Sequence, residues 1–266
     1  MIPKVIHYCW FGGNPLPDLA KQCIASWKKY LPDYEIKEWN EGNFDLNCCN
    51  YVKEAYESKK WAFVSDYARF WILYNYGGLY FDTDVEVIKD MSDIIARGAF
   101  MGCEAVDKCA PGLGLGANPG LGLYQEILEF YNHIHFTTDS DRIPTVVDYT
   151  TSILEKHGWM GTNEISEVEG ITIYPPEYFC PYSFITGKLN ITNHSVSIHH
   201  YAATWFSLLD KTIANIERCD KKKHPCIYSL RRSISLPLRA INKLRKIGIY
   251  KTLQEAKNKL MRSGNL

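Results

Sequence analysis

Two acidic side chains one residue apart, Asp82 and Asp84, are the most informative chemical feature of this 266-residue sequence. They follow the short apolar run Leu79-Tyr80-Phe81, which is typical of a buried strand. Residues two apart on an extended backbone face the same side. Two carboxylates on one side, at the carboxyl edge of a sheet where ligands bind, predict a hard-cation site. A cation there can bridge the phosphates of a nucleotide diphosphate and stabilise the charge that grows as a sugar departs.

Asp66 and Arg69 form a second candidate pair, upstream of these aspartates. They are three residues apart within an apolar run from Trp61 to Tyr76, which predicts a helix on which the two side chains share a face. Burying charges is costly unless they are paired. Two roles fit the pair. The side chains could bind sugar hydroxyls and a phosphate, or they could form a structural ion pair that links the helix to the sheet. Spacing alone leaves both roles open.

The Asp-x-Asp tripeptide also has other interpretations. One is a solvated turn. Another is the active site of phosphatases and mutases with an aspartate nucleophile, which use Asp-x-Asp after an apolar strand. In that class Thr or Val usually follows two residues later. Here that position is Glu86, which argues against this class.

Strands and helices alternate in the part of the sequence that must position these side chains. Residues 4–11 predict a buried strand, residues 17–31 an amphipathic helix, and residues 34–39 a second strand. The helix over 61–76 is expected to end at Gly77-Gly78, since a glycine often follows the last turn. A strand, a helix and another strand in this order predict an α/β sheet.

The glycines between Gly112 and Gly122 predict a loop, either a plain surface loop or one near the acceptor with Asn118 as a contact. Their spacing misses the Gly-x-Gly-x-x-Gly pattern of a dinucleotide site. The remaining expected elements are helices over 50–58, 123–133 and 144–156, an extended segment over 85–87, and strands over 171–174 and 195–198.

Four blocks, in their order and spacing, resemble glycosyltransferase family 32. This family has a sugar-binding region that contains Asp-x-Asp and includes capsule and cell-wall polysaccharide enzymes and yeast-type mannosyltransferases. Its core is similar to the glucosylating domains of large clostridial toxins. The blocks are Trp10 after the first strand, Ser65-Asp66-x-x-Arg69, Gly77-Gly78-x-Tyr80-x-Asp82-x-Asp84, and His199-His200-Tyr201 followed by Trp205.

The resemblance implies a GT-A fold, a Rossmann-like single α/β domain with a mixed central sheet, over residues 1–210. It also implies a nucleotide-sugar donor, Mn²⁺ or Mg²⁺, and retention of the anomeric configuration. By position, Asp82 contacts the ribose and the water shell of the metal, and Asp84 binds the metal directly. The expected donor contacts are Trp10 on the base, Ser65, Asp66 and Arg69 on the sugar, and Tyr80 and Thr83 beside it.

A late histidine often completes the metal site of GT-A enzymes, and we favour His200 over His199. A strand places the two on opposite faces, so only one can point into the site. A surface or core histidine is the alternative. Trp205 is a candidate for a lid over the donor, although the adjacent Thr204 departs from the toxin-type spacing. No general base is assigned, and Glu104 and Asp148 are open candidates for neighbours of the acceptor.

The C-terminal 56 residues, 211–266, differ in charge from the rest of the chain. They hold 15 Lys and Arg against three Asp and Glu, a net charge of +12 in a chain whose total is zero. Apolar residues recur there at spacings of three and four, which predicts a basic amphipathic helical tail, with Pro237 as a kink or break. Such a helix suits an anionic membrane surface. A helix packed on the catalytic domain is the alternative, and no motif supports nucleic-acid binding.

The N-terminus lacks the features of a signal peptide, and no apolar stretch approaches the roughly 20 residues that span a bilayer. The nine cysteines show no zinc spacing, so we expect them to be reduced. These features predict a cytoplasmic protein on the inner face of the membrane. The expected function is hexose transfer from a nucleotide-sugar, with UDP favoured, to a saccharide or lipid-linked oligosaccharide acceptor in capsular or cell-surface polysaccharide synthesis. The alternatives are a nucleotide-sugar hydrolase or phosphotransferase and a non-catalytic nucleotide-sugar-binding protein.

Overall fold

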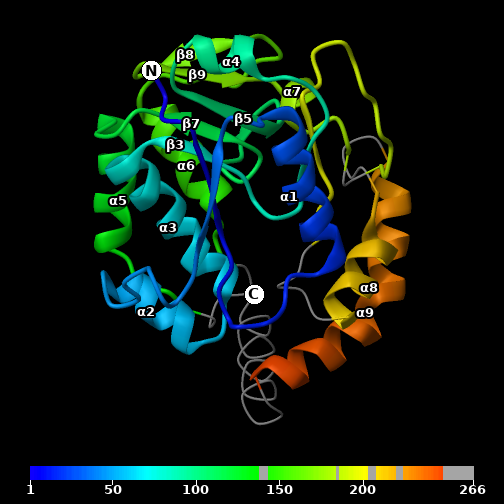
Figure 1. Cartoon of the computed structure of the whole chain (residues 1–266). Coiled ribbons are helices and arrows are strands. Elements are labelled where there is room, and N and C mark those ends of the chain that lie inside the picture. Colours follow the sequence, from blue (N-terminus) through cyan, green and yellow to red (C-terminus); the bar gives the residue numbers. More distant parts are fainter. Residues whose placement is uncertain (138–142, 184–185, 203–207, 220–223, 248–266) are drawn as a thin grey trace. The chain divides into compact units, whose positions relative to one another are not determined.

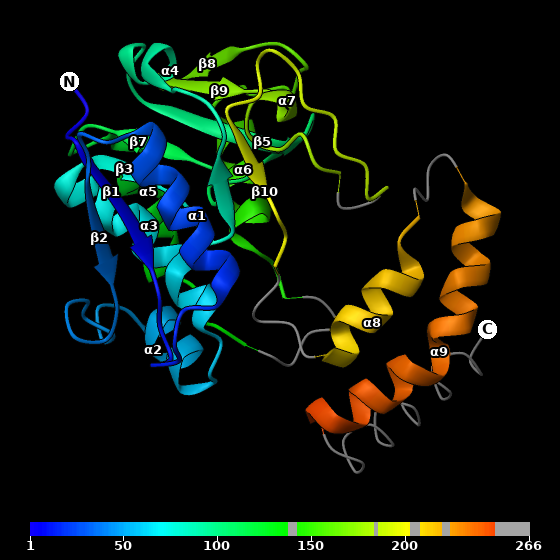
Figure 2. The same ribbon diagram turned by 45° about the vertical axis from the view of Figure 1, so that its right-hand side comes forward.

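A computed structural model describes residues 1–137, 143–183, 186–202, 208–219 and 224–247. The chain divides into two units, residues 1–182 with 189–202 and residues 183–188 with 203–266. The first unit contains the α/β sheet and its helices, and the second contains helices α8 and α9 (Figures 1 and 2). The domain boundary expected at residue 210 stays a prediction.

The main sheet of the first unit is mixed, as expected from the resemblance. Its order among the described strands is β2-β1-β3-β7-β5-β9-β8, with β6 paired to β5. Strands β2, β1 and β3 are parallel, β7 runs antiparallel to both β3 and β5, and β9 is parallel to β5. A separate antiparallel pair joins β4 and β10. The bounds are β1 (Val5–Cys9), β2 (Glu35–Trp39), β3 (Gly78–Tyr80), β4 (Val85–Val87), β5 (Phe100–Ala105), β6 (Lys108–Cys109), β7 (Leu115–Ala117), β8 (Ser166–Val168), β9 (Ile171–Tyr174) and β10 (Ser197–His199).

Helices cover both faces of this sheet. One apolar core lies beneath α2, α3, α5 and α6, and a second lies beneath α1, α4 and α7. Figure 1 shows α2, α3 and α5 together on one side and α1 on the other. The helix bounds are α1 (Asp18–Tyr30), α2 (Asn50–Glu57), α3 (Trp61–Tyr76), α4 (Ser92–Ala96), α5 (Gly122–Asn132), α6 (Val146–Lys156), α7 (Pro176–Phe179), α8 (Leu208–Glu217) and α9 (Pro225–Ile247). The alternation predicted from the sequence is thus confirmed, and the fold class is α/β.

The turn from α3 into β3 fixes the strand that leads to the Asp-x-Asp pair. Both glycines there have positive φ, +64° at Gly77 and +99° at Gly78. The ring of His7 on β1 binds this turn. Its Nδ1 accepts the indole N–H of Trp39 (3.0 Å), so its Nε2 donates to the carbonyl of Gly77 (3.0 Å). Burial lowers the pKa of His7 to about 4, which keeps the ring neutral.

The prediction of a loop between Gly112 and Gly122 is wrong in part, because this segment contains β7. The strand lies in the middle of the sheet, between β3 and β5. Glycines are needed there because aromatic rings pack directly on the backbone. A Cβ at Gly116 would lie 2.2 Å from the ring of Phe100. Gly116 belongs to the run of glycines that indicates a loop in the sequence, but in the folded chain it makes room for the packing of the core.

The cysteines and the hydropathy of the helices can also be compared with the expectations from the sequence. All nine cysteines are free. Among the described helices, none combines the length and the apolar character required to cross a membrane.

We predict that Gly78→Ala destabilises the protein, because a Cβ there would lie 2.6 Å from the carbonyl oxygen of Val5 and the φ of +99° is strained for alanine. The expected loss is at least about 2 kcal/mol, which lowers Tm by roughly 4–8 °C in a domain of this size. Gly122→Ala is the matched control, since nothing lies within 4 Å of its Cβ position. Thermal unfolding followed by circular dichroism measures both, and equal Tm values would contradict the role given to Gly78.

Candidate active site

The topology brings the predicted site residues to one edge of the sheet. Strands β1 and β3 are parallel, and β5 runs in the same direction as β3 because β7 is antiparallel to both. The carboxyl ends of β1, β3 and β5 therefore lie at the same edge, where α/β sheets bind ligands. Trp10 follows β1, Asp82 follows β3, and Glu104 lies near the end of β5.

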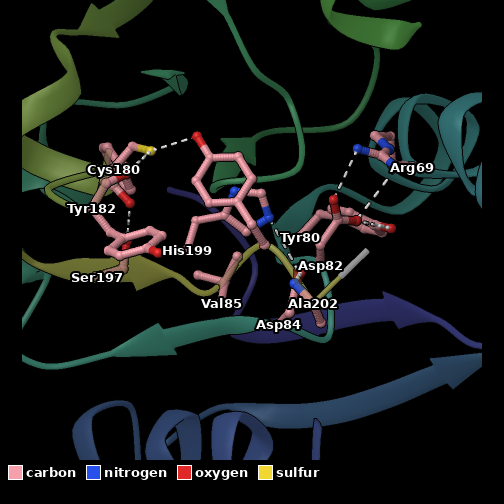
Figure 3. A network of polar contacts seen from close by, with 12 residues as sticks. Arg69, Tyr80, Asp82, Asp84, Val85, Cys180, Tyr182, Ser197, His199 and Ala202 are labelled. Atoms are coloured by element: carbon pink, nitrogen blue, oxygen red, sulfur yellow. Dashed lines mark hydrogen bonds and ion pairs between the residues drawn. The ribbon is translucent and has the colours of Figure 1, made fainter. Parts of the chain in front are cut away.

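A buried arginine joins helix α3 to the Asp-x-Asp segment. The Nη2 of Arg69 lies 2.9 Å from Asp66 Oδ1 and 3.3 Å from Asp82 Oδ1, and its Nε donates to the carbonyl of Ser65 (3.0 Å). The side chain of Arg69 is only 4% exposed. Figure 3 shows this guanidinium facing Asp82 across the site. The structural ion pair considered from the sequence is therefore present, and it extends to Asp82.

Burial sets the protonation of this network. It raises the pKa of Asp66 to about 7, although the neighbouring Arg69 opposes the shift. Burial also disfavours the charged form of Arg69, but the neighbouring Asp82, Tyr80 and Asp66 together outweigh it and raise the pKa of Arg69 above its usual range. Arg69 is thus a permanent cation between two carboxylates, and the raised pKa of Asp66 weakens the negative charge of that carboxylate.

Tyr80 and Gly112 complete the surroundings of Asp82. The hydroxyl of Tyr80 donates to Asp82 Oδ1 (3.0 Å), and the backbone N–H of Asp82 donates to the carbonyl of Gly112 (2.9 Å). A Cβ at Gly112 would lie 1.9 Å from Asp82 Oδ2. Gly112 was not predicted as a site residue. It is one of several glycines in this run, so its sequence alone does not indicate that it packs against Asp82.

Asp84 lies in a different environment, beside β10. Its Oδ1 lies 3.3 Å from Nε2 of His199, and its Oδ2 accepts the backbone N–H of Ala202 (2.8 Å). Burial disfavours the charged carboxylate, but these two partners lower the pKa of Asp84 below its usual value. Burial also opposes the charging of His199, and Asp84 outweighs it, which raises the pKa of His199 to about 10. The two groups form a partly buried ion pair, seen at the centre of Figure 3.

The late histidines face opposite sides, as expected, but the ring beside Asp84 is not the one we favoured. The ring of His200 lies 2.9 Å from Glu86. His200 contacts Asp84 only through the backbone, where the N–H of His200 donates to the carbonyl oxygen of Asp84 (2.9 Å). The register of β10 against β4 pairs His199 with Val85, and this register places the His199 ring beside Asp84. The geometry thus favours His199 over the predicted His200 as the histidine that acts on Asp84.

The other predicted donor contacts are more dispersed. The indole N–H of Trp10 donates to the carbonyl of Asn14 (2.6 Å), and the ring is partly exposed at the sheet edge. Ser65 donates to the carbonyl of Trp61 (3.2 Å). Thr83 is partly exposed between the two aspartates. Trp205 lies outside the described residues.

The donor set fits a cation that is bound together with a ligand, not a preformed metal cage. Within residues 1–137, 143–183, 186–202, 208–219 and 224–247, no three His, Cys, Asp or Glu side chains form a group that could hold a metal. The carboxylates of Asp82 and Asp84 remain 30% and 17% exposed. Mg²⁺ in proteins is commonly held by one or two carboxylates together with waters and substrate phosphates. Two accessible carboxylates satisfy that requirement.

Comparison with known proteins places part of this site within a matched region. Residues 17–101 match the family model described as "Glycosyltransferase sugar-binding region containing DXD motif". The inositol phosphoceramide mannosyltransferase 1 of Schizosaccharomyces pombe is 29% identical over 111 residues, which are 38% of this chain and 33% of that protein. The chain thus spans about a third of the length of this yeast relative. The uncharacterized glycosyltransferase L373 of Acanthamoeba polyphaga mimivirus is 23% identical over 73% of this chain and 83% of its own.

Two solved structures are also similar to the chain. The PaToxG glycosyltransferase has a TM-score of 0.45 and 18% identity, over 58% of this chain and 69% of its own. A glycosyltransferase involved in the glycosylation of the major capsid of PBCV-1 has a TM-score of 0.44 and 12% identity, over 76% and 95%. The matched family region contains Asp66, Arg69, Asp82 and Asp84. Residues 17–101 thus match a glycosyltransferase sugar-binding region containing a DXD motif, and the resemblance inferred from the sequence is confirmed.

Proposed function

We propose that the protein is a metal-dependent, retaining glycosyltransferase that moves a hexose from a nucleotide-sugar to a saccharide acceptor. The observation that carries the proposal is the buried Arg69, which binds Asp66 and Asp82 together at the carboxyl edge of the sheet. The position of these residues within the matched sugar-binding region supports a donor site there. UDP is the favoured nucleotide of the donor, because the resemblance at Trp10 favours it. The mannosyltransferase name of the yeast relative keeps GDP as the alternative.

Each residue of the site has a role in this proposal. Trp10 stacks on the base, and the partly exposed Ser65 and Thr83 line the path of the donor. Tyr80 is buried and acts on the donor through its hydrogen bond to Asp82. Asp66 and Arg69 are almost fully buried, so their main task is to hold Asp82 in place for the ribose and sugar. His199 orients Asp84 through their ion pair.

Asp82 and Asp84 would hold the Mn²⁺ or Mg²⁺ ion, whose charge offsets the negative charge that develops on the diphosphate. In a same-face reaction the acceptor oxygen bonds to the anomeric carbon as the bond to phosphate breaks. The departing phosphate oxygen takes the acceptor proton. This reaction requires no protein base, so we assign none.

We further propose that the acceptor is lipid-linked and that the tail meets an anionic membrane surface on the cytoplasmic side, as in capsular or cell-surface polysaccharide synthesis. Four apolar side chains of α9 are exposed at spacings of three, four and seven, which places them on one stripe of the helix. Arg231 and Arg232 are exposed as well. The yeast relative is named as an enzyme of a lipid, inositol phosphoceramide, which supports an acceptor of this kind. The stripe consists of Ile227, Leu230, Ile234 and Ile241.

The proposed function predicts a thermal shift with one class of nucleotide-sugar, seen with Mn²⁺ and lost in EDTA. A ligand at a hundredfold excess over its Kd stabilises the folded state by about 2.7 kcal/mol. Asp84→Asn should abolish both the shift and turnover, because the cation loses a charged ligand. Asp93→Asn, at an exposed carboxylate on α4, is the control.

The same assay separates the alternatives. Sugar release that does not depend on an acceptor indicates a hydrolase, and binding without turnover indicates a binding protein. A shift that persists in EDTA and in Asp84→Asn would contradict the metal assignment.

The two late histidines give a paired prediction. His199→Asn removes the ion pair with Asp84, and loss of such a supporting partner typically costs about 10–100-fold in metal affinity or activity. His200→Asn removes only the contact with Glu86, so we expect a much smaller loss. Initial rates measured over a range of Mn²⁺ concentrations give the comparison. A greater loss in His200→Asn would restore the original preference for His200 as the metal ligand.

For the tail, we predict that the full chain sediments with anionic vesicles of phosphatidylglycerol and that salt weakens the binding, since Debye screening is stronger at high salt. The double variant Leu230→Asp with Ile234→Asp should reduce the bound fraction. Leu236→Asp is the matched control, because Leu236 is exposed but lies on the opposite side of the helix from the stripe. Unchanged sedimentation of the double variant would refute the membrane role of α9.

A further inference from the structure

The loop that carries Trp10 needs contacts from other segments to keep one shape. It joins β1, which ends at Cys9, to α1, which begins at Asp18. Its backbone includes Gly12 and Gly13, which have positive φ values of +95° and +65°. Glycine loses more backbone freedom on ordering than any other residue, so the conformation of such a loop depends on what holds it.

The indole of Trp10 closes this loop on itself. Its N–H donates to the carbonyl of Asn14 (2.6 Å), and Gly12 lies midway between these two residues in the sequence. The backbone N–H of Trp10 donates to the carbonyl of Trp39 at the end of β2 (2.8 Å). The orientation of the Trp10 ring therefore depends on where the backbone from Gly12 to Asn14 is held.

Glu41, which follows the end of β2, holds the centre of the loop. Its Oε1 accepts the backbone N–H of Gly12 (2.6 Å) and the hydroxyl of Tyr56 on α2 (3.2 Å). Hydrogen bonds between a backbone N–H and a carboxylate are roughly twice as strong as those between neutral groups. One carboxylate oxygen thus connects the loop after β1 with the segment after β2 and with helix α2.

A second contact places Trp61, the first residue of α3, against the same point of the loop. A Cβ at Gly12 would lie 2.3 Å from Nε1 of Trp61, so the indole packs directly on the glycine backbone. The ring of Trp61 also packs on the ring of Tyr56, with their centroids 5.0 Å apart. Helix α3 carries Asp66 and Arg69, so this contact links the loop to the helix of the proposed donor site.

Glu41 and Trp10 share the ligand-binding edge of the sheet. Strands β1 and β2 are parallel, so the segments that follow their carboxyl ends emerge at the same edge. Both side chains are partly exposed there. A loop that is already fixed in the conformation that a ligand requires binds it more tightly, because the cost of ordering the loop is not met on binding. The contact between Glu41 and Gly12 is suited to that task.

We propose that Glu41 is a positioning residue for the nucleotide, because its bond to Gly12 keeps the Trp10 ring in the orientation that stacks on the base. The assignment rests on the proposed function, since it takes Trp10 as the platform for the base of a nucleoside diphosphate. Glu41 acts through the loop and does not touch the ligand. Its loss therefore weakens nucleotide binding and leaves the groups at Asp82 and Asp84 in place.

The test measures the Kd of UDP and of GDP with Mn²⁺, by isothermal titration calorimetry, for the wild type, Glu41→Ala and Glu41→Gln. In Glu41→Ala we expect the Kd to rise about tenfold, through loss of a hydrogen bond to a charged group. Glu41→Gln should show a smaller rise, since its amide oxygen still accepts the Gly12 N–H. The KM for the donor should rise with the Kd, while kcat changes much less.

A double-variant cycle separates positioning from a general loss of stability. When Glu41→Ala is combined with Trp10→Ala, the nucleotide Kd should stay close to that of Trp10→Ala alone, because Glu41 acts through the Trp10 ring. Glu35→Gln, at the exposed start of β2, is the matched control and should bind nucleotide as the wild type does.

A wild-type Kd in Glu41→Ala overturns the assignment, as does a fall in kcat without a change in Kd. Effects of Trp10→Ala and Glu41→Ala that simply add also overturn it. Should Glu41→Ala fail to fold, Glu41→Gln replaces it in both comparisons. When the wild type binds neither UDP nor GDP, the proposed function fails and the assignment fails with it. When the wild type binds one of them and the Glu41 variants bind it equally well, only the assignment fails.

Discussion

The structure of the site depends on one buried cation. The guanidinium of Arg69 pairs with Asp66 on its own helix and with Asp82 after β3, so a single charge connects two segments that meet only in the folded chain. A buried charge without a partner is strongly unfavourable, and removing one member of a buried pair typically costs about 3–5 kcal/mol. Helix α3 and the Asp-x-Asp segment are therefore held in one arrangement. Any ligand of Asp82 meets a carboxylate whose position is already set.

Features governed by local sequence could be predicted. The bounds of α3 follow from its apolar run and from the glycines that end it, and α1 follows from its four-residue spacing. The place of Asp82 at the edge of the sheet follows from the strand before it. Each of these depends on a few neighbouring residues, which is why the sequence alone carries the information. The matched region from 17 to 101 covers this same local part of the chain.

Features governed by distant contacts could not be predicted. Alternation along β10 shows that only one of His199 and His200 faces the site, but the choice depends on the register with β4, more than 100 residues earlier. The strand β7 could not be recognised because its one glycine, Gly116, serves the packing of Phe100 rather than a turn. In each case the deciding partner lies far away in the sequence.

The charges of the site explain why a cation and a donor are expected to bind together. Asp82 is already paired with Arg69, and Asp84 is already paired with His199. Each carboxylate has spare lone pairs, but a divalent cation placed between them also meets two resident positive charges. The negative charge of Asp66 is weakened by its raised pKa. The additional negative charge must then come from the ligand, and a diphosphate supplies it. In the proposed function, Asp82 and Asp84 would thus supply half of a metal site, and the donor would complete it.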